Sequence, residues 1–440
     1  MPVLKRRLSL MVAIVMITML VATPTFAAKT KITYWHQWTG QWSKVLEDIA
    51  NLFNESQDQI EVKAVVIPEN FRERLMSSAA VGDMPDVVSL TGDGNLYMAE
   101  RGLFQPIDKL MGENEWKQFQ EWALPVVWEV NDWKGHVWAL TPYIDCCSLY
   151  YNKAHFTEAG LDPEAPPSTI TELDAFAEKL TRYDARGNID VIGFYPSWGL
   201  DYWGTVFGGQ FVDEDGAPTF NKDPNILAAL EWIASYSHKY DVNKIVAFES
   251  GLSEERAGAL DPFISKKKSM EQQGQWVIIN LANYAEEDFS YGIAPYTPYP
   301  EGGKQGGVLV RSAYGALAIP SGSKNAEAAL EFIKFWVGYG YEAQRAKIFE
   351  WGAWMPLDRE QKVWEQATTV QYLNMFPQFA TFRGILTMQN WTVMQTPVDS
   401  FLFNRISAAR DYARLLEKNP QKALDDAAAE VMKEYERIRK

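Results

Sequence analysis

Apolar residues near the start of the chain follow a strand–helix–strand–helix–strand order, and this order constrains the fold more than any other feature. Residues 32–35, 60–67 and 84–88 carry the short apolar runs of buried strands. Residues 42–53 carry apolar side chains at helical spacing, and residues 70–80 form a second predicted helix. Strands separated by helices in this way pair in parallel through right-handed crossovers. The sequence therefore predicts an α/β fold.

The ends of these strands form the first candidate site. In open parallel sheets, ligands bind beyond the carboxyl ends of the strands. That rule points to the loop that contains His36 and Trp38, and to residues 90–95, which contain Asp93.

A second informative stretch runs from residue 145 to residue 180. A short apolar strand follows Asp145, an AGLDP turn and a double proline interrupt regular structure, and Thr169 with Glu172 forms a capping box before an amphipathic helix. This order of YNK, AGLDP, PP and a capped helix resembles the extracellular solute-binding proteins of bacterial ABC importers. The similarity is strongest to the maltose-binding-like, carbohydrate-binding branch of that family.

Other segments resemble the same family, and together they cover nearly all of the chain. They are GDMPDVVSLTGDGNLYMAERGLFQPIDKL at residues 82–110, KSMEQQGQW at residues 268–276, GALAIP at residues 315–320 and PQKALDDAAAEV at residues 420–431.

The resemblance implies a two-lobed periplasmic-binding-protein fold of type II, known as a Venus-flytrap. Each lobe is expected to be a mostly parallel sheet flanked by helices, with three crossings between the lobes. The N-terminal lobe is expected to comprise residues 29–144 and 312–353. The C-terminal lobe is expected to comprise residues 145–311 and 354–440, including the C-terminal helices.

Residues 1–28 are typical of an export signal. Lys5, Arg6 and Arg7 precede an apolar run, and small residues follow it, so we expect cleavage near Ala27 or Ala28. No cysteine lies at that point, so we expect a periplasmic protein rather than a lipoprotein.

The charge of the chain limits its partners. A formal net charge of -15 argues against nucleic acid and anionic membranes as partners, because both attract clustered Lys and Arg. We expect a monomer that meets the permease subunits of an ABC importer. The adjacent Cys146 and Cys147 are expected to be buried and reduced, because neighbouring Cα atoms lie too close for an ordinary disulfide.

An enzyme is not expected. The four histidines are scattered, and the chain carries no zinc-type spacing, nucleophile elbow, phosphate-binding loop or dinucleotide motif. Carboxylate pairs such as Asp93 and Asp145 could serve a glycosidase, but among 57 acidic residues such a pair carries little weight. No metal or cofactor is expected either.

A sugar site needs flat apolar faces for the rings and strong acceptors or donors for the hydroxyl groups. The residues that we expect to contact ligand are His36, Trp38, Asp93, Asp145, Trp198, Asp201, Trp203, Trp276, Arg311 and Trp354. Trp351 and Trp391 are weaker candidates. The family resemblance implies that Asp93 meets sugar hydroxyls and that Trp276 stacks on the ligand. Gly94 stands where maltose binders often have a charged contact, which argues against maltose itself.

We therefore expect a protein that captures a sugar or oligosaccharide by hinge closure between its lobes and delivers it to an ABC permease. A binder of a polyol or glycerol phosphodiester in the same fold is the alternative, and a glycoside-active enzyme is a weaker one. A phosphate ligand would need several basic residues, and Arg311 is the single one near a predicted crossing.

Overall fold

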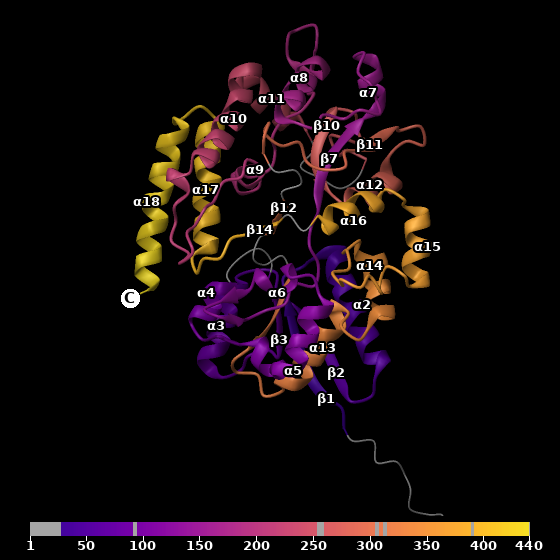
Figure 1. Cartoon of the computed structure of the whole chain (residues 1–440), viewed down its shortest axis with the longest axis vertical. Coiled ribbons are helices and arrows are strands. Elements are labelled where there is room, and N and C mark those ends of the chain that lie inside the picture. The colour runs from indigo at the N-terminus through magenta and orange to yellow at the C-terminus, as the bar shows by residue number, and fades with distance from the viewer. Residues whose placement is uncertain are drawn as a thin grey trace, which may run out of the picture.

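The computed structural model describes residues 28–90, 95–252, 259–303, 308–310, 315–388 and 391–439, with the backbone alone described at residues 308–310 and 391–392. The chain forms two lobes, one above the other in Figure 1. The first lobe holds the N-terminal part of the chain, and the second holds the middle and the C-terminal helices. The expected two-lobed α/β fold is thus confirmed.

The sheet of the first lobe has the strand order β2–β1–β3–β13–β4. Its strands are β1 (Thr30–His36), β2 (Ile60–Val66), β3 (Val87–Leu90), β4 (Phe104–Gln105) and β13 (Ala316–Pro320). β1 pairs in parallel with β2 and β3, as the strand–helix order predicts, and β13 pairs antiparallel with β3 and β4. The carboxyl ends of β1 and β3 point toward the second lobe in Figure 1.

The sheet of the second lobe corrects the expectation of two mostly parallel sheets. Its strands are β7 (Cys147–Asn152), β10 (Met270–Gly274) and β11 (Tyr291–Ile293). Both β10 and β11 pair antiparallel with β7. A strand that pairs in parallel with β7 must be connected to it by a crossover. β10 and β11 come from segments far from β7 in the chain, so they can pair with it in either direction.

Helices flank both sheets (Figure 1). In the first lobe they are α2 (Gly40–Ser56), α3 (Phe71–Val81), α4 (Asn95–Glu100), α5 (Ile107–Trp122), α6 (Val126–Glu129), α13 (Ala326–Val337) and α14 (Glu342–Gly352). In the second lobe they are α7 (Lys153–Glu158), α8 (Ile170–Leu180), α9 (Leu200–Val206), α10 (Pro224–Tyr240), α11 (Val242–Gly251), α12 (Val277–Tyr284), α15 (Ala367–Met375), α16 (Phe379–Thr387), α17 (Asp399–Arg414) and α18 (Pro420–Ile438).

Short elements complete the fold. They are β5 (Asp132–Trp133), β6 (His136–Val137), β8 (Arg182–Tyr183), β9 (Ile189–Val191), the 3₁₀ turn η1 (Phe220–Lys222), β12 (Val308–Val310) and β14 (Trp391–Val393). β12 and β14 pair in parallel between the lobes, so two distant segments run side by side there. Among the described residues, no helix combines the length and the apolar character needed to cross a membrane.

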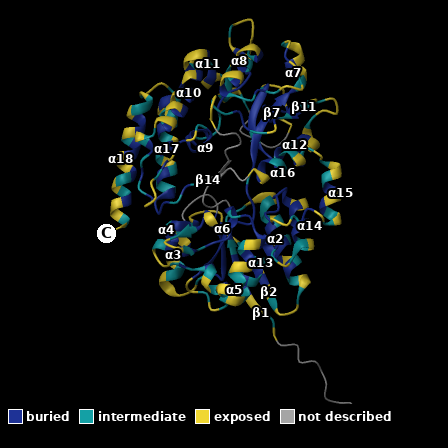
Figure 2. Cartoon of the chain, in the orientation of Figure 1, coloured by how far each residue is buried: buried dark blue, intermediate teal, exposed yellow. Residues whose placement is uncertain are grey.

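The helices form where the sequence pattern predicts them. α2 turns Leu46, Ile49 and Phe53 into the core of the first lobe, and each such burial stabilises the fold by about 1.5–3 kcal/mol. At the start of α8, the Thr169 hydroxyl accepts from the Glu172 backbone N–H, and the Glu172 carboxylate accepts from that of Thr169. The predicted capping box is therefore confirmed. Figure 2 shows the strands buried and the outer helix faces exposed.

The two adjacent cysteines join different cores. Cys146 packs in the apolar cluster that extends from the first lobe to Tyr150, and Cys147 packs in the cluster of the second lobe. Both side chains are buried, as expected. Successive side chains of an extended segment point to opposite sides, which explains the division.

Candidate functional site between the two lobes

Four aromatic side chains gather where the first lobe meets the second. Tyr143 and Trp354 stack with ring centroids 5.0 Å apart and 12° between their planes. Trp42 lies 5.6 Å from Trp354, and Trp38 lies 6.3 Å from it. Tyr143 and Trp354 are buried, whereas Trp38 and Trp42 are half-buried. We call these four residues the first-lobe aromatic group.

Two glycines make room for the stacked rings. A Cβ atom at Gly315 would lie 2.8 Å from the Tyr143 ring, and one at Gly352 would lie 2.5 Å from the Trp354 ring. Gly315 also has a φ of +74°, a conformation that glycine adopts without strain. The sequence places a residue without a side chain beneath each ring.

Trp198 and Trp276 form a second aromatic surface on the other lobe. Their ring centroids lie 6.3 Å apart with 31° between the planes, and both side chains are half-buried. The indole N–H of Trp198 donates to the Gln272 carbonyl at 2.6 Å, which fixes that ring against β10. A Cβ atom at Gly274 would lie 2.0 Å from the Trp276 ring, so this ring also lies across a glycine. We call these two residues the second-lobe aromatic pair.

Asp145 connects the two aromatic surfaces. It follows Tyr143 by two positions, and its carboxylate accepts a hydrogen bond from the side-chain amide of Gln275 at 3.1 Å. The Gln275 side-chain carbonyl in turn accepts from the Cys146 backbone N–H at 3.0 Å. Since Trp276 is the next residue, this double contact links the segment leaving the first lobe to the second-lobe aromatic pair.

Burial raises the pKa of Asp145 to about 6, and the amide of Gln275 opposes part of that shift by stabilising the charged form. The carboxyl group therefore changes its charge near neutral pH. As a carboxylate it accepts charge-assisted hydrogen bonds, which are roughly twice as strong as neutral ones.

Arg345 of α14 fixes the segments beneath the aromatic group. Its buried guanidinium donates to the carbonyls of Pro142, Trp354 and Met355 at 3.1, 2.8 and 3.0 Å. Burial lowers the pKa of Arg345 to about 10, and the nearby Asp358 carboxylate partly compensates. One side chain thus holds the residue before Tyr143 and the backbone of Trp354 together.

Several expected ligand contacts are buried in the structure. Trp203 has no exposed surface and packs against Trp232 at 4.7 Å within the second core, because every residue of α9 is buried. Its expected contact with a ligand stays a prediction, although the side chain is covered in this structure. His36 and Asp201 are also buried, and burial lowers the pKa of His36 to about 4, so its ring is neutral.

Other expected contacts lie outside the described part of the chain. Asp93 and Arg311 are outside the described residues, and the side chain of Trp391 is not described. Trp351 is exposed on α14. Of the expected residues, Trp38 contacts Trp354, Trp198 contacts Trp276, and Asp145 lies on the segment that connects the two sets. Their contact with a ligand stays a prediction.

Sequence reasoning missed four residues of this site. The sequence pattern places Trp42 on the apolar face of a helix and Tyr143 at the first crossing without predicting a ligand contact for either, and it singles out neither Gln275 nor Arg345. Gln275 stands inside the KSMEQQGQW segment, so that motif could have drawn attention to it. Among the described residues, no group of three or more His, Cys, Asp or Glu side chains could hold a metal ion.

Two α/β lobes that carry aromatic side chains on either side of a connecting segment are the arrangement of a two-lobed binding protein. The chain belongs to the bacterial extracellular solute-binding protein family. The model of that family matches residues 48–379. The expected family is therefore confirmed.

Solved structures of similar proteins carry sugars. The chain is similar to CpMnBP1 with mannotriose bound, at 27% identity and a TM-score of 0.77, covering 92% of this chain and 100% of that one. A maltotriose-bound MalE domain from Bdellovibrio bacteriovorus shares the fold at 20% identity and a TM-score of 0.67, covering 92% of this chain and 99% of that one.

The name of a curated relative refers to a solute that is not a sugar oligomer. The sn-glycerol-3-phosphate-binding periplasmic protein UgpB of Salmonella paratyphi A is 23% identical over 295 residues. That match spans 64% of this chain and 65% of the relative, which is just under two thirds of the relative's length.

Proposed function

We propose that this extracellular solute-binding protein captures a sugar or oligosaccharide between its lobes and delivers it to an ABC permease. The observation that carries the proposal is the pair of half-buried tryptophan surfaces on opposite lobes, connected by the Asp145–Gln275 hydrogen bond. Tryptophan faces suit the C–H faces of sugar rings, and a carboxylate between them suits the hydroxyl groups. The sugar-bound CpMnBP1 structure, at 27% identity, supports the same ligand class.

The proposed mechanism is closure of the two lobes over the ligand. A ligand that contacts both aromatic surfaces binds the closed form more tightly and shifts the population toward it. The hinge is proposed at the three crossings near residues 143–147, 308–313 and 352–357. The lobes are then residues 29–144 with 312–353 and residues 145–311 with 354–440.

Glycerol 3-phosphate or a glycerol phosphodiester is the second candidate, because UgpB carries such a name. A phosphate group binds best to several Arg or Lys side chains or to helix N-termini. The charged side chain between the described aromatic surfaces is the acid Asp145, and the guanidinium of Arg345 is directed to backbone carbonyls. These charges favour a neutral, hydroxyl-rich ligand.

The remaining details are part of the same proposal. The protein is proposed to act as a monomer in the periplasm, after cleavage near Ala27 or Ala28 and without a lipid anchor. It is proposed to release its ligand unchanged, so a chromogenic glycoside would not be turned over. No nucleic-acid partner is proposed.

Native mass spectrometry of the purified protein, followed by calorimetric titration, tests the function. A retained hexose-based mass and saturable binding of mannose- or glucose-based oligosaccharides are expected. Binding of glycerol 3-phosphate with no response to any sugar would instead establish the second candidate.

A further inference from the structure

The two lobes also meet on the side of the molecule where α3 and α4 lie below α17 (Figure 1). Arg72 of α3 donates from its guanidinium to the hydroxyl of Ser400 at the start of α17, with 2.8 Å between Nη2 and Oγ. The two residues are 328 positions apart in the chain, and both are half-buried. This hydrogen bond joins the lobes without using any residue of the two aromatic surfaces.

An aromatic ring and a glycine form a second contact between the lobes. The indole N–H of Trp133 in β5 donates to the Glu100 carboxylate at 2.7 Å, which fixes the ring on the first lobe. On the second lobe, Gly216 lies so near this ring that a Cβ atom there would be 3.2 Å from it. The ring of Trp133 therefore packs against the turn that contains Gly216.

A third contact uses the backbone of α6. The side-chain amide of Gln395, which lies shortly before α17, donates to the Glu129 carbonyl at 2.6 Å. Gln395 also borders the turn of the second contact, because a Cβ atom at Gly216 would lie 2.9 Å from the Gln395 carbonyl oxygen. We call the three contacts together the edge contact, and they are Arg72–Ser400, Trp133–Gly216 and Glu129–Gln395.

The turn at Gly216 is fixed to the second lobe by side chains of that lobe. The Thr396 hydroxyl donates to the Gly216 carbonyl at 2.7 Å. The Tyr435 hydroxyl of α18 donates to the Asp215 carbonyl, also at 2.7 Å. A movement of the second lobe therefore carries this turn away from the ring of Trp133 or toward it.

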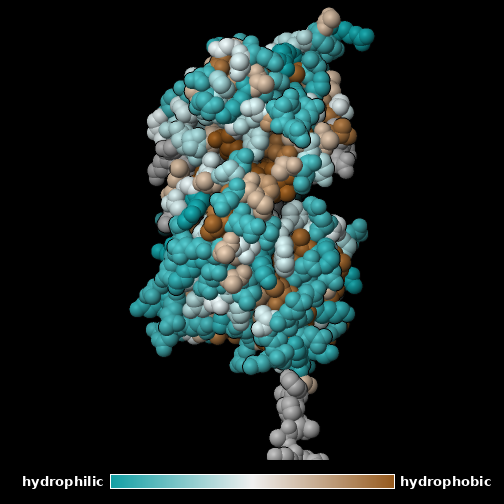
Figure 3. Space-filling model, turned by 90° about the vertical axis from the view of Figure 1, so that its right-hand side faces the viewer, coloured by the Kyte–Doolittle hydropathy of each residue, from teal (hydrophilic) through white to brown (hydrophobic). Residues whose placement is uncertain are grey.

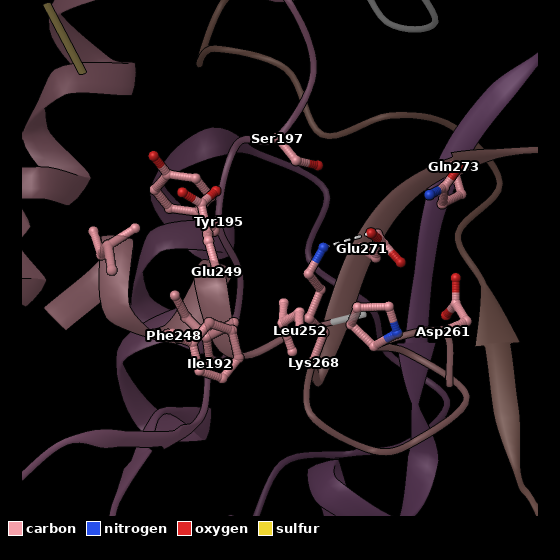
Figure 4. Close-up of a pocket in the computed structure, with 12 residues that line it drawn as sticks. Ile192, Tyr195, Ser197, Phe248, Glu249, Leu252, Asp261, Lys268, Glu271 and Gln273 are labelled. Carbon is pink, nitrogen blue, oxygen red and sulfur yellow. Dashed lines mark hydrogen bonds and ion pairs between the residues drawn. The ribbon is translucent and has the colours of Figure 1, made fainter. Parts of the chain in front are cut away.

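α17 is fixed to the same lobe at its other end. Arg414 of α17 donates to the Tyr195 hydroxyl at 3.0 Å and to the Glu249 carboxylate at 2.7 Å. Figure 4 shows Tyr195 and Glu249 together on one side of a cavity of about 210 Å³ in the second lobe. Because α17 also packs on α9 and α10, Ser400 moves with the second lobe.

The side chain of Arg72 is held on the first lobe. The ring of Tyr97 in α4 has its centroid 5.5 Å from the Arg72 guanidinium and 4.6 Å from that of Arg101. A guanidinium is attracted to the face of an aromatic ring. Opening of the lobes therefore leaves Arg72 with Tyr97 and separates it from Ser400.

Contacts between the lobes that need no ligand favour the closed state in the absence of ligand. A protein whose binding-competent state is only partly populated binds with an apparent affinity that is reduced by that fraction. Contacts that raise the closed population therefore raise the affinity for every ligand by the same factor, although they touch none of them.

We propose that the edge contact stabilises the closed state of the ligand-free protein and thereby sets a part of the affinity that is common to all ligands. This inference rests on the lobe closure proposed above, but its first test needs no ligand.

Small-angle X-ray scattering of the ligand-free full chain provides that first test. The double variant Arg72→Met/Gln395→Met removes both side-chain donors of the edge contact and keeps unbranched side chains of similar length. We expect its radius of gyration to exceed that of the ligand-free wild type. In calorimetric titrations with mannotriose and maltotriose, we expect the affinity for each sugar that the wild type binds to fall at least fivefold, and by the same factor for both.

Matched variants separate closure from stability. Arg74 is exposed on the same helix as Arg72, so Arg74→Met should leave the radius and the affinities unchanged. Ser400→Ala should reproduce part of the effect of the double variant, whereas Ser400→Thr keeps the hydroxyl group and should behave like the wild type. Thermal denaturation of each variant shows that it is folded.

Two results would overturn the proposal. One is a radius of gyration of the ligand-free double variant equal to that of the wild type. The other is an affinity in Arg72→Met/Gln395→Met that stays within twofold of the wild type. If neither sugar bound the wild type, the proposed function would fail, and the scattering comparison would still decide whether the edge contact holds the lobes together.

Discussion

Tyr143 and Trp354 stack face to face with 5.0 Å between their ring centroids, although they belong to distant parts of the chain. Three features hold this contact. Gly315 and Gly352 leave room for the rings, and Arg345 binds the carbonyl of the residue before Tyr143 and the carbonyl of Trp354. The position of the two stacked rings in the candidate site is therefore set by backbone contacts and by glycines. Figure 3 shows patches of hydrophobic residues around the middle of the molecule, among mostly hydrophilic surface.

Replacing Arg345 by methionine should loosen this contact. The change leaves three buried carbonyls without their donor, and each costs about 1–3 kcal/mol, while removal of the buried charge offsets part of the loss. We expect the free energy of unfolding to fall by about 3 kcal/mol, measured by denaturant titration, and Tyr143–Trp354 stacking to weaken in near-UV circular dichroism. The exposed Arg437→Met is the control and should change neither quantity. An unchanged near-UV spectrum in Arg345→Met would contradict this role.

Trp276 and Trp203 should respond in opposite ways to truncation. Trp276 is half-buried beside Trp198, so Trp276→Ala should lower ligand affinity at least tenfold with a small change in thermal midpoint. Trp203 is fully buried, so Trp203→Ala should lower the free energy of unfolding by about 3–5 kcal/mol through the cavity that it leaves. Calorimetry and thermal denaturation of both variants measure the contrast. A loss of affinity without a loss of stability in Trp203→Ala would indicate that Trp203 contacts the ligand.

Gly274 should matter for binding although it offers no side chain. A Cβ atom there would lie 2.0 Å from the Trp276 ring, so Gly274→Ala forces that ring to move. We expect at least a tenfold loss of affinity for whichever sugar the wild type binds. Gly384 of α16 has open space around it, and Gly384→Ala should keep full affinity and gain about 0.5–1 kcal/mol in helix stability. Equal affinities in the two variants would remove the proposed role of the Trp276 position.

Asp145 should make stability depend on pH between about 4 and 6. Its pKa is raised from 3.8 to about 6 in the folded protein, so the folded state binds more protons than the unfolded state in this window. Stability therefore falls as the pH rises through the window, because the buried carboxyl group must become charged. Asp145→Asn removes this contribution. The thermal midpoint of the wild type, taken relative to that of the variant, should therefore fall from pH 4 to pH 7. A constant difference across that range would show that the carboxyl group titrates normally.

The sequence predicts local features of this protein better than contacts between distant segments. The parallel pairing of β1 with β2 and the Thr169–Glu172 capping box follow from neighbouring residues, and both are present. Trp198 and Trp203 could not be separated, because their exposure depends on α10 and β10, which come much later in the chain. The antiparallel second sheet was missed for the same reason.

Because Cys146 and Cys147 lie in two different cores, they can report separately on the unfolding of each core. Both side chains are buried, so each becomes accessible only when its own cluster opens. Alkylation with a small reagent during partial denaturation would mark both events on one short peptide. The order in which the two marks appear would then reveal which half of the molecule unravels first.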